Sequence, residues 1–208
     1  ALVDTVLAGG SEAVDIDISE IRLAVARDPF YKALEKETSV VVEDTLALLK
    51  KNGANIVEID MKELFSLNDK VSFQIAVFET VRDLRDYLRE NDTGITLEEM
   101  VEAIASPDVK HIMQASLTDQ SIPEEVYKEA LNIDRPQMQE MYASYFKDNN
   151  IDAMLYPTTI LTARPIGQDE TIELNGEEAP TFPSYVRNCD PSSNAGIPSL
   201  SIPAGLAS

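Results

Sequence analysis

The segment 182–206 reads FPSYVRNCDPSSNAGIPSLSIPAGL and carries the most specific pattern of the chain. Five polar side chains crowd into its middle: Asn188, Asp190, Ser192, Ser193 and Asn194. The run 199–203 follows, and its alternation of polar and apolar residues predicts a strand. Pro198 and Pro203 disfavour a helix here. We therefore expect the polar residues to lie on a loop that feeds a strand, where ligand contacts concentrate.

A structural role for the same polar residues is also open. Asp and Asn side chains stabilise tight turns by hydrogen bonding to their own backbone. The pattern alone does not decide between such a turn and a ligand-binding cluster.

A β-α-β unit is predicted near the start of the chain. Residues 21–27 alternate as a strand does, and Asp28-Pro29 ends them. Residues 34–51 have the apolar stripe of a helix, which basic residues and Gly53 terminate. Residues 55–60 form the next strand. A strand, a helix and a strand in this order imply parallel pairing with a right-handed crossover.

The range 61–150 is almost entirely helical by its pattern. Capping boxes are expected at 96–99 and 121–124, and Ser106-Pro107 separates two short helices. Pro136 is expected to break or kink the last helical stretch. This range predicts a helical lobe inserted into an α/β sheet.

The chain then returns to the sheet. Residues 151–157 are a short buried strand, and 164–181 is predicted to be a loop rich in Pro, Gly and acidic residues. The fold class is α/β, a mixed sheet with flanking helices and an inserted all-helical lobe. Three parts follow from this: 1–60 and 151–208 in the sheet core, and 61–150 as the lobe.

Composition narrows the function classes. The 208 residues include 37 acidic and 17 basic side chains, a net charge of −20. Nucleic-acid binding is disfavoured, because phosphate contacts need a surplus of Lys and Arg. No apolar run is long enough to span a membrane, and the first residues lack a basic signal-peptide region. A single cysteine, Cys189, permits no internal disulfide. We expect a cytoplasmic protein.

Searches for common catalytic constellations find little. His111 is the only histidine, and no second ligand stands at metal-binding spacing. No Gly-x-Ser-x-Gly elbow and no phosphate-binding glycine loop is present. Cys189 has no activating cation nearby except Arg187. The sequence therefore predicts neither a metal site nor a cofactor.

The C-terminal motif resembles the closing part of the amidase signature family, whose members hydrolyse carboxylic amides. The form DPSSNAGIPSLSIPAGL is most similar to the branch that acts on arylacetamides such as indoleacetamide and mandelamide. The resemblance covers nearly the whole chain. It also includes the segment 53–58, the helix with Tyr127, Ala130 and Arg135, and the segment 152–158.

Members of this family use a Ser–cis-Ser–Lys triad taken from a Gly-Ser-rich segment and an upstream lysine. Neither is present here, because Gly9-Gly10-Ser11 lacks the second serine and the small residues after it. The resemblance therefore implies a partial amidase domain with no catalytic residue in this chain, inactive on its own. Such a piece is expected to expose apolar faces, with self-association or a homodimer as the consequence.

The resemblance also implies where a small, aromatic amide would bind before hydrolysis to an acid and ammonia. One wall of the site would hold Pro157, Thr158 and Thr159. The other wall would hold Asn188, Asp190, Ser193 and Asn194, and Phe78 or Phe73 would reach in from the helical lobe. An aromatic acyl group suits an apolar pocket with a few polar groups.

Two other functions remain open at this point. The chain is compatible with a binding or regulatory module that kept the amidase-like fold without catalysis. It is also compatible with a fragment of the amidotransferase branch, which works on aminoacyl-tRNA with partner subunits. The charge of −20 disfavours direct tRNA contact.

Overall fold

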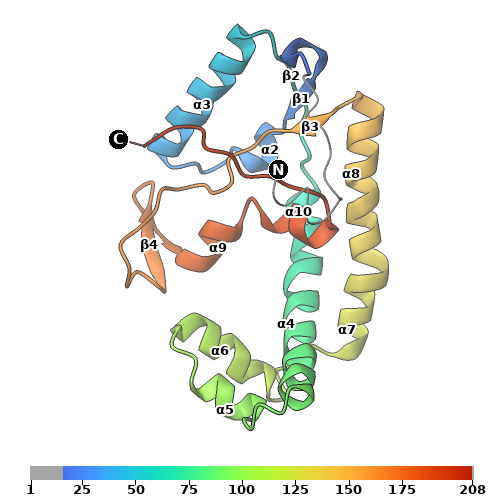
Figure 1. Ribbon diagram of the computed structural model, residues 1–208, viewed down its shortest axis with the longest axis vertical. Helices are drawn as coiled ribbons and strands as arrows, with labels where there is room; N and C mark the ends of the chain where they lie inside the picture. Colours follow the sequence, from blue (N-terminus) through green and yellow to red (C-terminus); the bar gives the residue numbers. More distant parts are fainter. Residues whose placement is uncertain (1–15, 208) are drawn as a thin grey trace.

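The computed structural model describes residues 16–207 (Figure 1). Its core is a parallel sheet in the order β2-β1-β3, formed by Arg22–Val25 (β1), Asn55–Glu58 (β2) and Ala153–Met154 (β3). Leu23 of β1 pairs with Ile56 on one side and with Ala153 on the other. Helix α3, Lys36–Lys51, connects β1 to β2. The predicted β-α-β unit is confirmed.

Two antiparallel helices form the layer beside the sheet. Helix α4, Leu64–Glu90, leads away from the sheet and α8, Arg135–Asn149, returns to it (Figure 1). Short helices occupy the far end of α4: α5 (Leu97–Glu102), α6 (Pro107–Ser116) and α7 (Glu124–Glu129). The remaining helices of the described part are η1 (Ile18–Glu20), α2 (Arg27–Phe30), the π-helical η2 (Ala130–Asp134), α9 (Thr181–Val186) and α10 (Asp190–Ala195).

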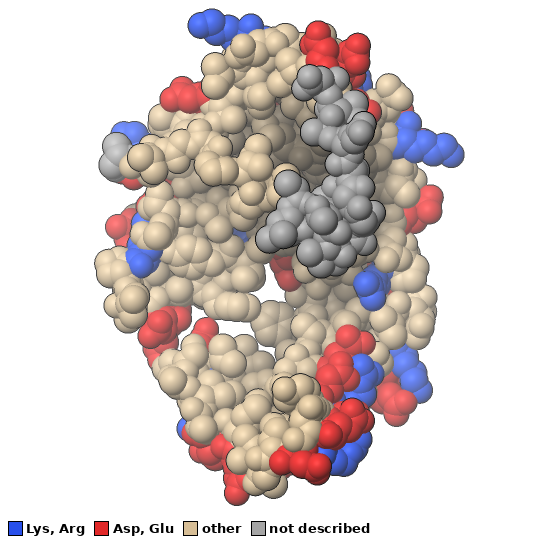
Figure 2. Space-filling model, viewed as in Figure 1, with Lys and Arg blue, Asp and Glu red and all other residues tan. Residues whose placement is uncertain are grey.

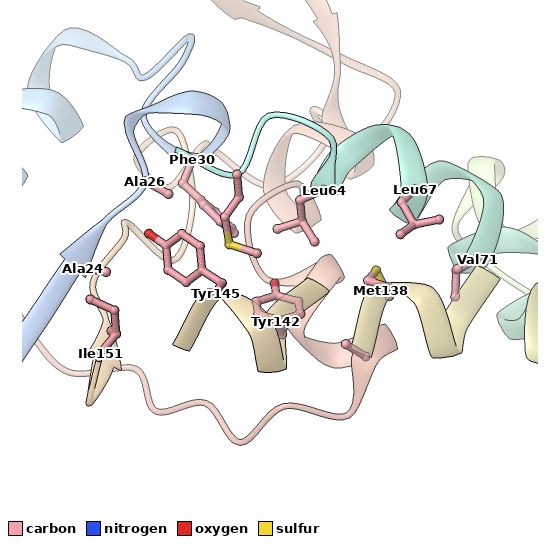
Figure 3. Packing of buried hydrophobic residues seen from close by; sticks show 12 residues of the cluster. Ala24, Ala26, Phe30, Leu64, Leu67, Val71, Met138, Tyr142, Tyr145 and Ile151 are labelled. Atoms are coloured by element: carbon pink, nitrogen blue, oxygen red, sulfur yellow. The ribbon is translucent and has the colours of Figure 1, made fainter. Parts of the chain in front are cut away.

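The main core lies where the sheet meets α4 and α8 (Figure 3). Tyr142 and Met138 of α8 pack with Leu64 of α4, and the cluster extends to Ala24 of β1. Phe30 is fully buried in the same cluster. Burying aromatic and aliphatic side chains in this way is the main favourable contribution to folding. One core thus joins residues from all three predicted parts of the chain.

One of the two predicted capping boxes is present. The Thr96 hydroxyl accepts from the Glu99 amide at 3.1 Å, and the Glu99 carboxylate accepts from the Thr96 amide at 2.8 Å, which confirms that capping box. The box predicted at 121–124 is wrong. Pro123 is the N-cap of α7, and no side chain caps it. With Pro123 at the N-cap, Ser121 stands two residues too early for that role.

The interruption predicted at Pro136 takes the form of a π-helical turn. Residues Ala130–Asp134 are π-helical, and α8 begins with Arg135 directly after them. Pro136 is the second residue of α8, which directly follows this turn. The wider turn absorbs the clash that a proline causes inside a regular α-helix.

Two local predictions in the last third are wrong. Residues 164–181 contain an antiparallel hairpin of Thr171–Leu174 (β4) and Glu177–Pro180 (β5). Asn175 and Gly176 join the strands, with φ of 55° and 88°, the conformation that a two-residue hairpin turn requires. The strand predicted at 199–203 is absent, because no described strand pairs with it. Leu200 of this segment is 87% exposed.

The structure has the predicted fold class, an α/β arrangement with a parallel sheet flanked by helices. Among the described residues, no helix is both long and apolar enough to cross a membrane.

Candidate functional site

The polar cluster of the C-terminal motif lies on helix α10 and on the residues just before it, so the predicted loop is wrong. The prolines of this segment do not prevent the helix. Pro191 stands in its first turn, and Gly196 ends it with a left-handed φ of 73°. Proline near the start and glycine just past the end are favoured positions for both residues. Pro198 lies beyond this stop.

Asn188 joins the two predicted walls of the site. Its side chain is fully buried, and its Nδ2 donates to the carbonyl oxygen of Pro157 at 2.8 Å. The same Nδ2 donates to the carbonyl oxygen of Phe30 at 2.9 Å. A buried N–H group without a partner carries a large desolvation cost, which these two bonds avoid for Nδ2, whereas Asn188 Oδ1 is buried without a partner among the described residues. Asn188 therefore holds the 157–159 segment and the residue after the cis Asp28-Pro29 bond against α10.

Arg187, next to Asn188 in the chain, binds the same segment around Phe30. Its guanidinium donates to the carbonyl oxygens of Pro29, at 3.0 Å, and Lys32, and it stacks over the ring of Phe65 at 5.2 Å. Burial lowers the pKa of Arg187 from its usual range. Within the described residues it makes no ion pair with a carboxylate. Carbonyl oxygens and an aromatic face take the place of a counter-ion here.

Asp190 and Asn194 are one helical turn apart on α10, and a residue of α4 bridges them. Asn68 Nδ2 donates to Asp190 Oδ2 at 2.8 Å, and Asn68 Oδ1 accepts from Asn194 Nδ2 at 2.9 Å. Asn68 is only 6% exposed. Sequence analysis missed this residue. An asparagine within the apolar stripe of Leu64, Leu67 and Val71 was the available signal, because buried polar groups need partners.

The three residues of the other wall differ in their freedom to meet a ligand. Pro157 is buried under Asn188, and the Thr159 hydroxyl donates to the Leu161 carbonyl at 2.8 Å. Thr158 is exposed, and its hydroxyl lies 2.9 Å from that of Ser201. Ser193 of α10 is likewise exposed. Thr158 and Ser193 therefore retain the most accessible polar atoms of the predicted set.

Phe78 is not brought to α10. It stacks on Tyr127 of α7 with ring centroids 4.1 Å apart, and the Tyr127 hydroxyl donates to Glu79. It stands ten residues beyond Asn68 on α4, which corresponds to about 15 Å along the helix axis. Phe73 is nearer to Asn68 along the helix and is 45% exposed.

Figure 2 shows the molecular surface hollowed between the α5–α6 end and the part of the molecule above it.

No activated nucleophile is visible at this site among residues 16–207. The Ser192 hydroxyl donates to the Cys189 carbonyl and accepts from Tyr156 at 3.2 Å, so a phenol and a carbonyl are its partners. Burial raises the pKa of the Cys189 thiol, and the neighbouring Asp190 charge raises it further. A thiol becomes a nucleophile only as its thiolate. No group of three His, Cys, Asp or Glu side chains in the described part of the chain is arranged to hold a metal ion.

Comparison with known proteins identifies the class. Residues 10–208 match the family described as Amidase, and the chain belongs to that family. It is similar to an indoleacetamide hydrolase of Rhizobium radiobacter, 37% identical over 206 residues, covering 99% of this chain and 44% of that protein. It is also similar to a mandelamide hydrolase of Pseudomonas putida, 33% identical over 217 residues, covering 99% of this chain and 41% of that protein.

The likeness extends to three dimensions. A crystal structure of an amidase matches with a TM-score of 0.70 and 20% sequence identity, covering 97% of this chain and 43% of that one. The two proteins share a fold. The chain spans less than half of the length of the relatives named here.

Proposed function

We propose that this chain forms the substrate-side part of an amidase that hydrolyses a small aromatic carboxylic amide, of the mandelamide or indoleacetamide type, to the acid and ammonia. Membership of the amidase family and the names of two relatives support the reaction and the substrate class. In this reaction the C–N bond breaks, the acyl carbon takes the hydroxyl of water, and the nitrogen takes the remaining proton and leaves as ammonia.

One observation carries the proposal. Asn188 Nδ2 bridges the carbonyl oxygens of Pro157 and Phe30, so that two segments far apart in sequence meet at α10. The exposed hydroxyls of Thr158 and Ser193 and the polar groups of Asp190 and Asn194 stand near this junction. Positioned polar groups of this kind orient a ligand in an otherwise apolar pocket.

The chain by itself supplies recognition and not the nucleophile. Its sequence contains no Gly-Gly-Ser-Ser type segment, and the serines at α10 have no lysine or histidine partner among the described residues. Most of the rate enhancement of an acyl-transfer enzyme comes from an activated nucleophile and positioned oxyanion donors. We therefore expect the 208-residue chain to be inactive and a longer polypeptide containing it to be active.

Ammonia release from mandelamide and indoleacetamide tests this proposal, with the chain and the longer polypeptide measured in parallel. Activity in the longer polypeptide alone is the expected result. Activity in the 208-residue chain would show that a nucleophile was overlooked among Ser192, Ser193, Ser199 and Cys189. Absence of activity in both would favour a non-catalytic binding module.

A further inference from the structure

Asn68 is an unfavourable residue for its position in α4. Asparagine is a poor helix former because its side chain competes for backbone hydrogen bonds. The position is also buried, between the core residues Leu64, Leu67 and Val71. An apolar residue there would give α4 an unbroken apolar stripe. The benefit of Asn68 must therefore come from its two hydrogen bonds to α10.

These two bonds have a defined direction. Asn194 donates to Asn68 Oδ1, and Asn68 Nδ2 donates in turn to Asp190 Oδ2. A rotation of the Asn68 amide by 180° would set its NH₂ against that of Asn194 and its oxygen against the Asp190 carboxylate. Both contacts would then be repulsive. The orientation of Asn68 therefore sets the orientation of both side chains on α10.

Among the described residues, the bridge leaves one oxygen on each of the two α10 side chains without a partner. Within residues 16–207, Asp190 Oδ1 and Asn194 Oδ1 accept no hydrogen bond. A primary carboxamide offers two N–H donors that such acceptors suit. Acceptors held rigidly lose less entropy on binding than mobile ones.

We propose that Asn68 is a positioning residue for amide recognition, acting through Asp190 and Asn194. This inference rests on the proposed function. Asn68 itself meets no substrate: its amide donates to Asp190 and accepts from Asn194, which fixes the two free acceptors relative to the 157–159 wall.

Two substitutions test the hydrogen bonds of Asn68 to Asp190 and Asn194 separately. Asn68→Asp keeps an acceptor for Asn194 but places a carboxylate against Asp190. Asn68→Leu is of similar size and removes both bonds. In the longer polypeptide, each should lower kcat/KM for mandelamide by about tenfold or more, the ratio expected from losing a hydrogen bond to a charged group. The loss should fall mainly on KM. The control Asn91→Asp adds the same charge at the exposed end of α4 and should change kcat/KM less than twofold.

A second readout is independent of catalysis. In protein labelled with ¹⁵N-asparagine, the side-chain amide protons of Asn194 should exchange slowly with solvent in the unmodified protein and in Asn68→Asp, and rapidly in Asn68→Leu. Asn91, which bonds only within its own helix end, serves as the reference signal. This measurement requires no substrate. If the leucine variant does not fold, the kcat/KM of Asn68→Asp remains as the test.

The outcomes distinguish the two proposals. If the unmodified protein hydrolyses no amide, the proposed function fails, and the exchange rates alone decide whether Asn68 fixes Asn194. If the unmodified protein is active and both folded variants keep kcat/KM within twofold, the positioning role is overturned. Unchanged Asn194 exchange in Asn68→Leu would overturn it as well.

Discussion

Asn188 provides a direct test of how the two walls of the site are held together. Replacing it with alanine removes the donor from two carbonyl oxygens, those of Phe30 at 2.9 Å and Pro157 at 2.8 Å, in a fully buried place. Leaving a buried acceptor unsatisfied costs about 1–3 kcal/mol. For two acceptors, we expect Asn188→Ala to lower the free energy of unfolding by about 3–5 kcal/mol.

An isosteric variant separates hydrogen bonding from volume. Asn188→Asp fills the same space but places a carboxylate against two carbonyl oxygens. It should destabilise at pH 7 by at least as much as alanine, because an unpaired buried charge is costly. Asn132 is a matched control, since it is exposed and its amide bonds only to the Lys128 carbonyl. Asn132→Ala and Asn132→Asp should each change stability by less than about 1 kcal/mol.

Urea unfolding followed by circular dichroism measures these effects. With a slope of about 2 kcal/mol per molar urea, a loss of 4 kcal/mol moves the midpoint down by about 2 M. Proteolysis at the 157–159 segment should accelerate in the same variants. The reasoning would be refuted if Asn188→Asp unfolded within about 0.5 M of the unmodified protein, because the carbonyl contacts would then contribute little.

Three further predictions concern single groups. Burial acts to raise the pKa of Glu35, but hydrogen bonds from Arg164 and Thr162 outweigh it and leave the pKa below its ordinary value. The ionised form therefore stabilises the fold above about pH 4.5, and this stabilisation is lost as the pH falls through the folded-state pKa. Glu35→Gln should lower the free energy of unfolding by about 2 kcal/mol at pH 7 and by less at pH 3, as measured by urea titration. The raised pKa of Cys189 predicts slower alkylation by iodoacetamide at pH 7.5 than for N-acetylcysteine, and equal rates for the two thiols at that pH would contradict it. Gly176→Ala should cost about 1 kcal/mol from its φ of 88° alone, since no atom lies within 4 Å of the added carbon.

Local patterns in the sequence predicted the sheet and its crossovers well. The helix 36–51 and its flanking strands follow from residue periodicity and a basic, glycine-terminated helix end. These signals act within one helix or strand, so they can be recognised without knowing which other elements pack against it. The hairpin at 171–180 had a signal of the same kind, the Asn175-Gly176 turn, within a segment whose acidic composition suggested a loop.

Long-range contacts could not be predicted in the same way. The bridge from Asn68 to Asp190 joins residues 122 positions apart, and only the packing of α4 against α10 brings them together. The helix at 190–195 was missed because it is only six residues long and mostly polar, and because Pro198 and Pro203 follow closely after it. A proline disfavours a helix only in its interior, and Pro191 occupies the first turn.

The short segment from Arg187 to Asn194 couples the two halves of the molecule. The side chains of Arg187 and Asn188 donate to backbone carbonyls of the sheet side, at Pro29, Phe30, Lys32 and Pro157. Three residues later the same segment bonds to α4 of the helical side, through Asn68. A shift of α4 relative to the sheet would therefore strain this segment directly, because residues 187 and 188 are bonded to the sheet side, and Asp190 and Asn194 are bonded to α4. Any ligand that binds at Asp190 and Asn194 should in turn stabilise this packing, since binding to the folded state alone raises its stability. A substrate analogue that protects α4 amides from hydrogen exchange would demonstrate this coupling, and protection confined to α10 would argue against it.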